Sequence, residues 1–215
     1  MFIRKMTIRM VRNLLFDLDR DTVIKATHQA LFRVDLISNV GLYNGKMGMI
    51  ILFFHYSNYS GESEYNELAE GLLMDLLENL SYKESVDLAT GLAGVAWGLV
   101  YLLENGFLHK DITETILRIN RYILRQDLRR LEDLSFDTGL QGLIHYYNYG
   151  KTVLNDKNIP WFDELFVSDL TTMVDCLPIE SNLLLDQILS GNKIICFNIV
   201  RSICLLYTSP SPRDT

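Results

Sequence analysis

The feature that most constrains this sequence is an internal repeat, a Gly-x-x-Gly motif followed by an apolar run. It occurs three times, at Gly45 and Gly48, Gly91 and Gly94, and Gly139 and Gly142. The first glycines are 46 residues apart (45 to 91) and then 48 apart (91 to 139), which is room for two helices and two loops. We therefore expect a repeated helical hairpin. Because glycine lacks a Cβ, we expect the first glycine of each pair to adopt a positive φ and the second to let its helix pack closely.

The segments between the motifs have the period of amphipathic helices, with an apolar stripe and a polar opposite face. The first stripe is Leu68, Leu72, Leu76 and Leu80, and the second is Ile112, Ile116, Ile119 and Ile123. The runs that follow Gly48 and Gly91 are instead apolar nearly all round, which is typical of a helix buried on every side. Half-exposed outer helices thus alternate with buried inner helices.

This alternation predicts an all-α fold, a partial α/α toroid of helical hairpins, with an open solenoid as the competing arrangement. Few strands are expected, because no segment alternates with period two between turn signals. We expect one domain over residues 1–203, with repeats near residues 21–59, 62–106, 110–150 and 160–203.

Local signals predict several helix ends. Asp111 and Glu114 have the spacing of a capping box, and Pro160 stands where a first helical residue would be. A further helix is expected ahead of the first motif, with the apolar face Val23, Ala26, Ala30, Val34 and Ile37.

Residues 204–215 differ from the rest of the chain. They include Pro210 and Pro212, two of the four prolines, and the string LLYTSPSPRD resembles a tail that recurs at the ends of unrelated translated environmental reads. We expect residues 204–215 to be a non-native or disordered tail and the chain to be an N-terminal fragment.

Composition and charge exclude several classes of protein. With 48% hydrophobic and 22% charged residues, the chain is not intrinsically disordered. A net charge of −7 has the wrong sign for a protein that binds nucleic acid through its phosphates. No signal peptide is visible and no apolar run is long enough to span a bilayer, so membrane insertion is not expected. An odd number of cysteines indicates a reducing, cytoplasmic compartment: Cys176, Cys196 and Cys204.

On its glycine motifs the sequence resembles the lanthionine synthetase C-like (LanC-like) family, whose α/α toroid has a Gly-x-x-Gly motif at the start of each inner helix. The resemblance covers roughly residues 38–150 and lies in GLYNGKMGMIILFFHYS, VDLATGLAGVAWGLVYLLENG and DLSFDTGLQGLIHYY. Asp87, four residues before Gly91, matches the D-x-x-x-G-x-x-G form of the family's second repeat. A complete toroid of that family has seven hairpins and this chain has room for three to four, which agrees with a fragment.

The resemblance implies a chemistry and a set of partners. LanC-like cyclases add a cysteine thiol to a dehydrated serine or threonine of a precursor peptide, which closes a thioether (lanthionine) ring in lantibiotic biosynthesis. Zinc in that family binds the thiol and lowers its pKa. Asp87 matches an aspartate near the reaction centre and is the candidate catalytic residue. The implied partners are the precursor peptide and a dehydratase protein.

Two features depart from the family pattern. The family has a histidine immediately before the first glycine of its third repeat, where this sequence has Thr138, preceded by Asp137. The family's zinc ligands, a cysteine and then a Cys-His pair, belong to later hairpins and have no match here. We therefore expect no metal site and no cofactor in this chain, with zinc confined to the full-length protein, and no activity of the chain alone.

Two other functions remain open. A non-catalytic toroid could bind a peptide or a thiol ligand, and it would not need the missing histidine. A six-hairpin glycosidase would need two carboxylates that face its cavity, and Asp87 and Asp137 stand at comparable loop ends.

The remaining polar residues are expected to be structural. His145 is expected to pack in the core, and His55 with Tyr56 and Tyr59 at a helix end. The run from Arg125 to Arg130 ends an outer helix, where positive charge favours the helix dipole without any ligand.

Overall fold

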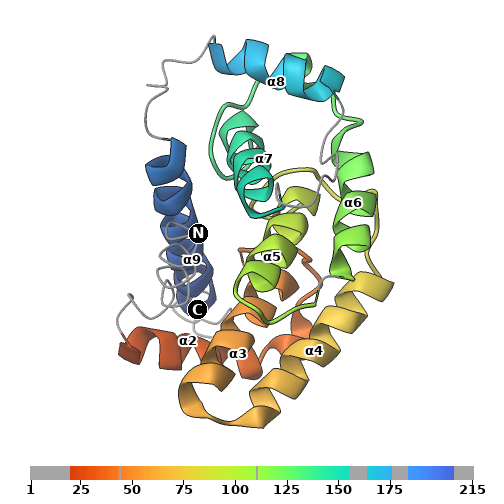
Figure 1. Ribbon diagram of the computed structural model, residues 1–215. Coiled ribbons are helices and arrows are strands. Elements are labelled where there is room, and N and C mark those ends of the chain that lie inside the picture. Colours follow the sequence, from red (N-terminus) through yellow and green to blue (C-terminus); the bar gives the residue numbers. More distant parts are fainter. Residues whose placement is uncertain (1–19, 44, 110, 155–163, 176–183, 206–215) are drawn as a thin grey trace, which may run out of the picture. The chain divides into compact units, whose positions relative to one another are not determined.

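The computed structural model describes residues 20–43, 45–109, 111–154, 164–175 and 184–205 (Figure 1). Within these ranges the protein is all-α, with two short 3₁₀ helices and no strand, so the predicted all-α class is confirmed and agrees with an α/α toroid. The helices are α2 (Arg20–Leu31), η1 (Val34–Leu36), α3 (Lys46–Ser60), α4 (Ser63–Glu78), α5 (Leu92–Glu104), α6 (Ile112–Ile123), η2 (Leu128–Arg130), α7 (Leu140–Leu154), α8 (Glu164–Asp175) and α9 (Leu184–Leu205). None of these described helices has both the length and the apolarity to cross a bilayer.

The described chain forms two compact units. In the first unit, α3 packs against both α2 and α4, and the part of α9 from Asn192 onward belongs to the same unit. The second unit runs from Ser81 to Gly191, and in it α5 packs against α6 and α7 while η2 packs against α8. In each unit, a helix that follows a glycine motif is the one that its neighbours cover.

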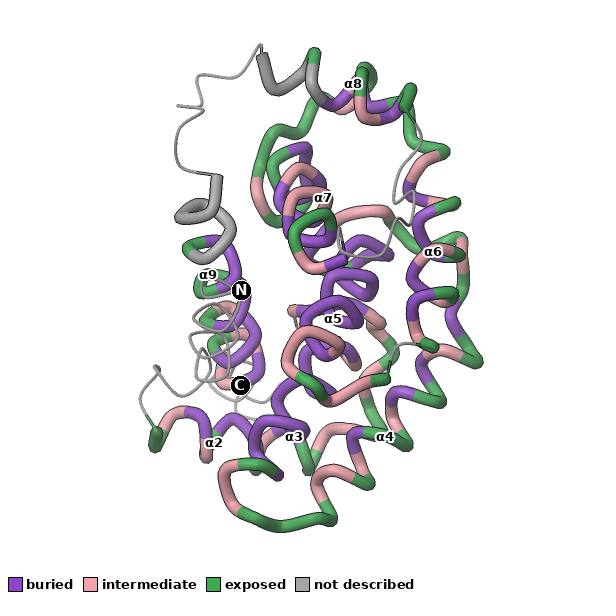
Figure 2. Tube along the Cα trace, in the orientation of Figure 1, coloured by how far each residue is buried: buried purple, intermediate pink, exposed green. Residues whose placement is uncertain are grey.

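The first two helices that follow glycine motifs are almost completely buried. Every residue from Met47 to Ser57 of α3 is buried, and so is every residue from Leu92 to Leu102 of α5. Figure 2 shows α5 buried along nearly its whole length. Their all-round apolar sequence therefore predicts their burial correctly, since such a helix has no polar face to turn toward water.

The predicted outer helices bury one face each. In α6 the isoleucine stripe is buried as predicted from Ile116 onward, while Ile112 is half-buried. In α4 the predicted stripe is only partly right, because Leu68 and Leu72 are half-buried while Ala69 and Leu73 are fully buried. A strict four-residue spacing drifts around a helix of 3.6 residues per turn, so the buried face falls on neighbouring residues.

Two local predictions differ from the structure near helix ends. The first predicted helix ends at Leu31, because Arg33 donates its N–H to the Ala30 carbonyl in a tight turn, and Val34 then lies in η1. The predicted capping box does not form at α6. Asp111 has helical backbone angles (φ −61°, ψ −27°), so its carboxylate accepts from the adjacent N–H rather than from the Glu114 N–H.

Some predictions concern residues at or beyond the ends of the described ranges. Helix α9 continues to Leu205, two residues beyond the predicted end of the domain at residue 203. The rest of the predicted tail, residues 206–215, lies outside the described residues, as do Pro160 and Cys176.

Candidate functional site

Each glycine motif is preceded by a loop that folds back over the first turn of the inner helix. These entry loops are residues 39–43 before α3, 85–90 before α5 and 133–138 before α7. In each case the carbonyl of the first loop residue accepts a hydrogen bond from the first N–H of the helix. The three bonds are Lys46 N to Asn39 O (2.8 Å), Leu92 N to Ser85 O (2.8 Å) and Leu140 N to Asp133 O (2.9 Å).

In the first two repeats the next two backbone N–H groups of the helix also donate to the loop, each to the carbonyl of the residue seven positions earlier. These bonds are Met47 N to Val40 O (3.2 Å), Gly48 N to Gly41 O (3.3 Å), Ala93 N to Val86 O (3.4 Å) and Gly94 N to Asp87 O (3.3 Å). The entry loops therefore occupy the donors that a helix N-terminus would otherwise offer to an anion.

The close approach of the entry loop explains the glycines. A Cβ would overlap the loop backbone at Gly45 (against Gly41), Gly48 (Leu42), Gly91 (Ser85), Gly139 (Asp133) and Gly142 (Phe136). The predicted positive φ of the first glycine is wrong, because φ is −127° at Gly45 and −109° at Gly91, in the extended region that any residue adopts. The motif thus serves close packing rather than an unusual backbone angle.

Asp87 lies in the second entry loop, and its carboxylate is bound within that loop. It accepts hydrogen bonds from the Ser85 hydroxyl (2.5 Å) and from the backbone N–H of Thr90 (2.6 Å). The Thr90 hydroxyl oxygen lies 3.1 Å from each carboxylate oxygen. Asp87 is half-buried. It therefore stabilises its loop in the way a capping carboxylate does, and it remains accessible at the surface.

The third entry loop builds the same network with serine and aspartate exchanged. Asp133 accepts from the backbone N–H of Ser135 (2.8 Å) and from the Thr138 hydroxyl (2.6 Å), and the two hydroxyl oxygens are 3.0 Å apart. The bond from Thr138, followed by those from Ser135, holds the pKa of the Asp133 carboxyl below its usual value. Thr138, which stands where the family has a histidine, is therefore part of a loop-stabilising network.

Asp133 is a residue that sequence reasoning missed, although a signal was present. The residues six, four and one positions before the first glycine are Ser, Asp and Thr in the second loop and Asp, Ser and Thr in the third. In the first loop, the side chain of Asn39 plays a similar part, since its oxygen accepts from the N–H of Gly41 (2.8 Å).

The second and third entry loops are in direct contact. The N–H of Ala89 donates to the carbonyl of Asp137 at 2.9 Å. The structure therefore brings the loops of Asp87 and Asp137 together, and with them the exposed hydroxyls of Thr90 and Thr138. Carboxylates and hydroxyls on two adjoining loops can accept protons from a bound substrate and orient its polar groups. We take this pair of loops as the candidate functional site.

His145 is buried, as predicted, and His55, which was predicted to pack at a helix end with Tyr56 and Tyr59, is buried as well. His145 of α7 packs against the rings of Phe136 (centroids 5.3 Å apart) and Tyr149 (6.3 Å). Burial lowers the pKa of His55 in α3 to about 4, so this imidazole is neutral at physiological pH. Neither histidine replaces the one that the family has before its third motif.

The tyrosines at the end of α3 form a packing group with the neighbouring helices. Tyr56 makes edge contacts with His28 of α2 (6.1 Å) and Tyr65 of α4 (4.6 Å), and the Arg20 guanidinium lies over the Tyr59 ring (4.7 Å). The predicted helix-end role of Tyr56 and Tyr59 agrees with these contacts.

The described residues do not fit a metal site. Nowhere in the part of the chain that the structure describes do three or more His, Cys, Asp or Glu side chains gather closely enough to hold a metal ion. Cys196 is buried in α9 and Cys204 is half-buried, and neither forms a disulfide.

Comparison with known proteins identifies the family. A family model described as lanthionine synthetase C-like protein matches residues 37–170, a range that includes all three entry loops and the helices α3, α5 and α7. No curated protein and no solved structure gives a significant match. Because the family model matches more than half of the chain, the protein belongs to the LanC-like family.

Proposed function

We propose that this protein acts in ribosomal peptide modification, where its full-length form makes thioether rings by adding a cysteine thiol to a dehydrated serine or threonine and residues 1–215 alone are inactive. Membership of the LanC-like family supports this class of chemistry. The structural observation that supports it most is the placement of Asp87, a half-buried carboxylate held by Ser85 and Thr90 next to a second acidic loop.

The reaction needs a proton acceptor near the sulfur and a proton donor near the α carbon. The S–H bond breaks, sulfur bonds to the β carbon of the dehydrated residue, and the α carbon takes up a proton, so no oxidant or reductant is required. In this proposal Asp87 orients the thiol proton or the group that carries it. The hydrogen bonds from Ser85 and Thr90 restrict the carboxylate to one geometry, which lowers the entropy cost of orienting the reactants.

The proposal also names the binding partners and the cellular compartment. The partners are a precursor peptide and the dehydratase that prepares it, and the setting is a reducing cytoplasm in which the substrate thiol stays free. Zinc is proposed only for a full-length protein that supplies further cysteine and histidine ligands. Since the described residues do not fit a metal, no step is assigned to it here.

The experiment compares Asp87→Asn with Asp133→Asn, since both residues stabilise an entry loop through equivalent hydrogen bonds. Both substitutions are made in the full-length protein, since the chain alone is expected to be inactive. Ring closure on a dehydrated precursor peptide is followed by mass spectrometry after alkylation, which labels only the thiols that have not reacted. Loss of a proton-handling group lowers the rate by about 100-fold or more, so we expect that loss in Asp87→Asn alone. If the two variants lose activity equally, the role of Asp87 is structural.

A second candidate function is a peptide- or thiol-binding protein without turnover. The observation that favours it is the hydrogen bond from Thr138 to Asp133, because the position of the family's histidine is then occupied by a loop-stabilising hydroxyl. Binding of the dehydrated peptide without consumption of its thiol, in wild type and in both variants, would select this function.

A further inference from the structure

One face of α6 presents a row of arginine side chains to solvent. Arg118 and Arg121 lie on the same side of α6, and Arg125, four residues after Arg121, lies in the turn that follows the end of the helix at Ile123. All three are exposed, and the half-buried Tyr122 lies among them. We name these four residues the arginine face. The opposite side of α6 is the buried isoleucine stripe, so the arginine face is the solvent side of the helix.

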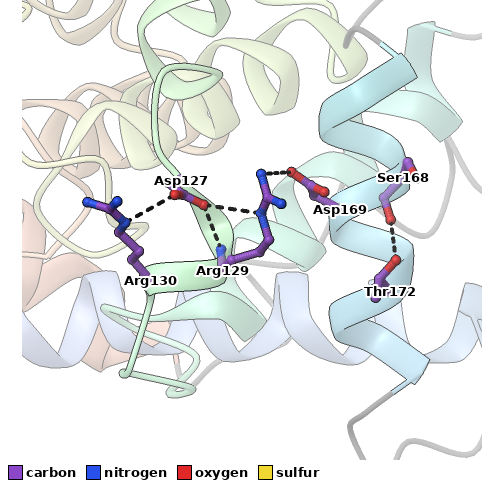
Figure 3. Close-up of polar contacts among 6 residues, drawn as sticks. All are labelled: Asp127, Arg129, Arg130, Ser168, Asp169 and Thr172. Carbon is purple, nitrogen blue, oxygen red and sulfur yellow. Dashed lines mark hydrogen bonds and ion pairs between the residues drawn. The ribbon is translucent and has the colours of Figure 1, made fainter.

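The arginines that follow in η2 are already paired. Figure 3 shows Arg129 between Asp127 and Asp169 of α8, with N···O distances of 3.5 and 3.6 Å. Arg130 also pairs with Asp127, and its Nε lies 3.2 Å from the Asp127 Oδ2. These two guanidinium groups neutralise carboxylates of the chain itself, and Arg129 also links η2 to α8.

The arginine face is different. Among the described residues, the side chains of Arg118 and Arg121 have no carboxylate partner, and that of Arg125 contacts an aromatic ring instead. The helix dipole favours a cation in the last turn of a helix, which accounts for Arg121. It does not account for Arg118, which lies near the middle of α6.

An aromatic stack holds one end of the arginine face. The guanidinium carbon of Arg125 lies 4.5 Å from the centroid of the Tyr122 ring. That ring stacks on Tyr82, with centroids 4.1 Å apart and planes 15° apart. A guanidinium held over an aromatic ring is attracted to the ring face and can still pair with a carboxylate. The contact therefore restricts the Arg125 side chain before any partner arrives, which lowers the entropy cost of binding.

We propose that the arginine face docks an acidic peptide segment of another protein. The planar guanidinium matches the geometry of a carboxylate and pairs with it through two parallel hydrogen bonds. Asp111 and Glu114 lie on the same side of α6 toward its N-terminus, so the positive surface is short and a long polyanion would meet repulsion there. A net charge of −7 further opposes a nucleic acid. The proposal concerns docking alone and does not depend on a catalytic role of Asp87.

The test measures binding of a short fluorescein-labelled, glutamate-rich peptide by fluorescence anisotropy, with the glutamine version of the peptide as reference. The arginine-face variant is Arg118→Gln, Arg121→Gln and Arg125→Gln. The control variant removes the same charge from exposed lysines elsewhere: Lys25→Gln, Lys151→Gln and Lys193→Gln.

Three exposed charge pairs together change a dissociation constant by about tenfold, so we expect about tenfold weaker binding in the arginine-face variant and less than about twofold in the control. Binding should also weaken as salt is added. Equal weakening in both variants, or no preference for the glutamate peptide in wild type, would overturn the proposal. Equally tight binding of a single-stranded oligonucleotide through the same arginines would overturn the assignment to a peptide.

Discussion

Thr138 donates its hydroxyl proton to the Asp133 carboxylate at 2.6 Å, across a loop that covers the start of α7. Thr90 and Asp87 have the matching relationship in the preceding repeat, with an oxygen–oxygen distance of 3.1 Å. The threonine before the glycine motif is thus constant between the two loops, while the acid and the serine exchange places. Hydrogen bonding to the Asp133 carboxylate stabilises its ionised form, so the network around Asp133 is strongest at neutral pH.

The first prediction concerns this hydrogen bond. Thr138→Val should raise the pKa of Asp133 toward its usual value, because Thr138 is the largest cause of its lowering. A carboxylate with a lowered pKa stabilises the fold above its ordinary pKa, and that contribution is lost as pH falls through the lowered value. The variant should therefore be less stable than wild type at neutral pH. Its free energy of unfolding should also change less than that of wild type as pH falls below neutral.

Carboxyl titration by NMR measures the effect. Thr152→Val is the control, because the hydroxyl of Thr152 donates to the Asn148 carbonyl rather than to Asp133. An Asp133 titration curve that is identical in wild type and Thr138→Val would contradict the role given to Thr138.

A second prediction concerns the glycine motif. Gly142→Ala should destabilise the protein by about 1–3 kcal/mol, because a Cβ there would overlap the Phe136 carbonyl and lie 3.0 Å from the Leu88 Cβ. Gly71→Ala is the matched control. Gly71 lies within α4 with open space around its Cα, so alanine should stabilise the helix there by about 0.5–1 kcal/mol. Urea denaturation should show opposite signs, and a loss of stability in both variants would contradict the packing argument.

A third prediction follows from the buried His55. Its pKa is about 4 in the folded protein against 6.5 as its ordinary value. Between these values the unfolded chain binds a proton that the folded chain does not, so the free energy of unfolding falls as pH falls through this window. The loss attributable to His55 reaches about 3 kcal/mol at pH 4. Urea titrations from pH 7 to pH 4 measure the slope.

His55→Gln should flatten this slope, while the same substitution at the exposed His109 should leave it as in wild type. An undiminished slope in His55→Gln would show that another group causes the pH dependence.

The fourth prediction concerns the half-buried Glu104 at the end of α5. Burial raises the pKa of its carboxyl, and a hydrogen bond from the Tyr149 hydroxyl (2.5 Å) partly offsets that shift. Tyr149→Phe should destabilise the protein at neutral pH by about 1–3 kcal/mol, since the carboxylate then lacks its donor. Because the folded pKa is raised, the penalty should shrink as pH falls and Glu104 becomes protonated.

Glu104→Gln removes the charge, so Tyr149→Phe should cost less in that background. A double-mutant cycle at neutral pH measures the coupling, and additive effects of the two substitutions would contradict a direct interaction.

Some features of this protein could be predicted from the sequence alone. The all-α class and the burial of the helices after Gly48 and Gly91 followed from glycine spacing and apolar periodicity, and the three motif segments by themselves resemble the LanC-like family. These are local properties, and a run that is apolar on every side must be buried in whatever packing the chain adopts.

Only the tertiary structure decided what the entry loops do. The predicted positive φ of the first glycine is wrong, because the structure shows a loop that lies against the helix start and excludes a Cβ there, while the close packing predicted for the second glycine is confirmed at Gly48 and Gly142. The equivalence of Asp133 to Asp87, and the use of Thr138 as a donor, likewise depend on that fold-back. Irregular segments have no period from which their backbone path can be read. Their side-chain partners are therefore set by contacts with the helices that they cover, and these contacts exist only once the chain is folded.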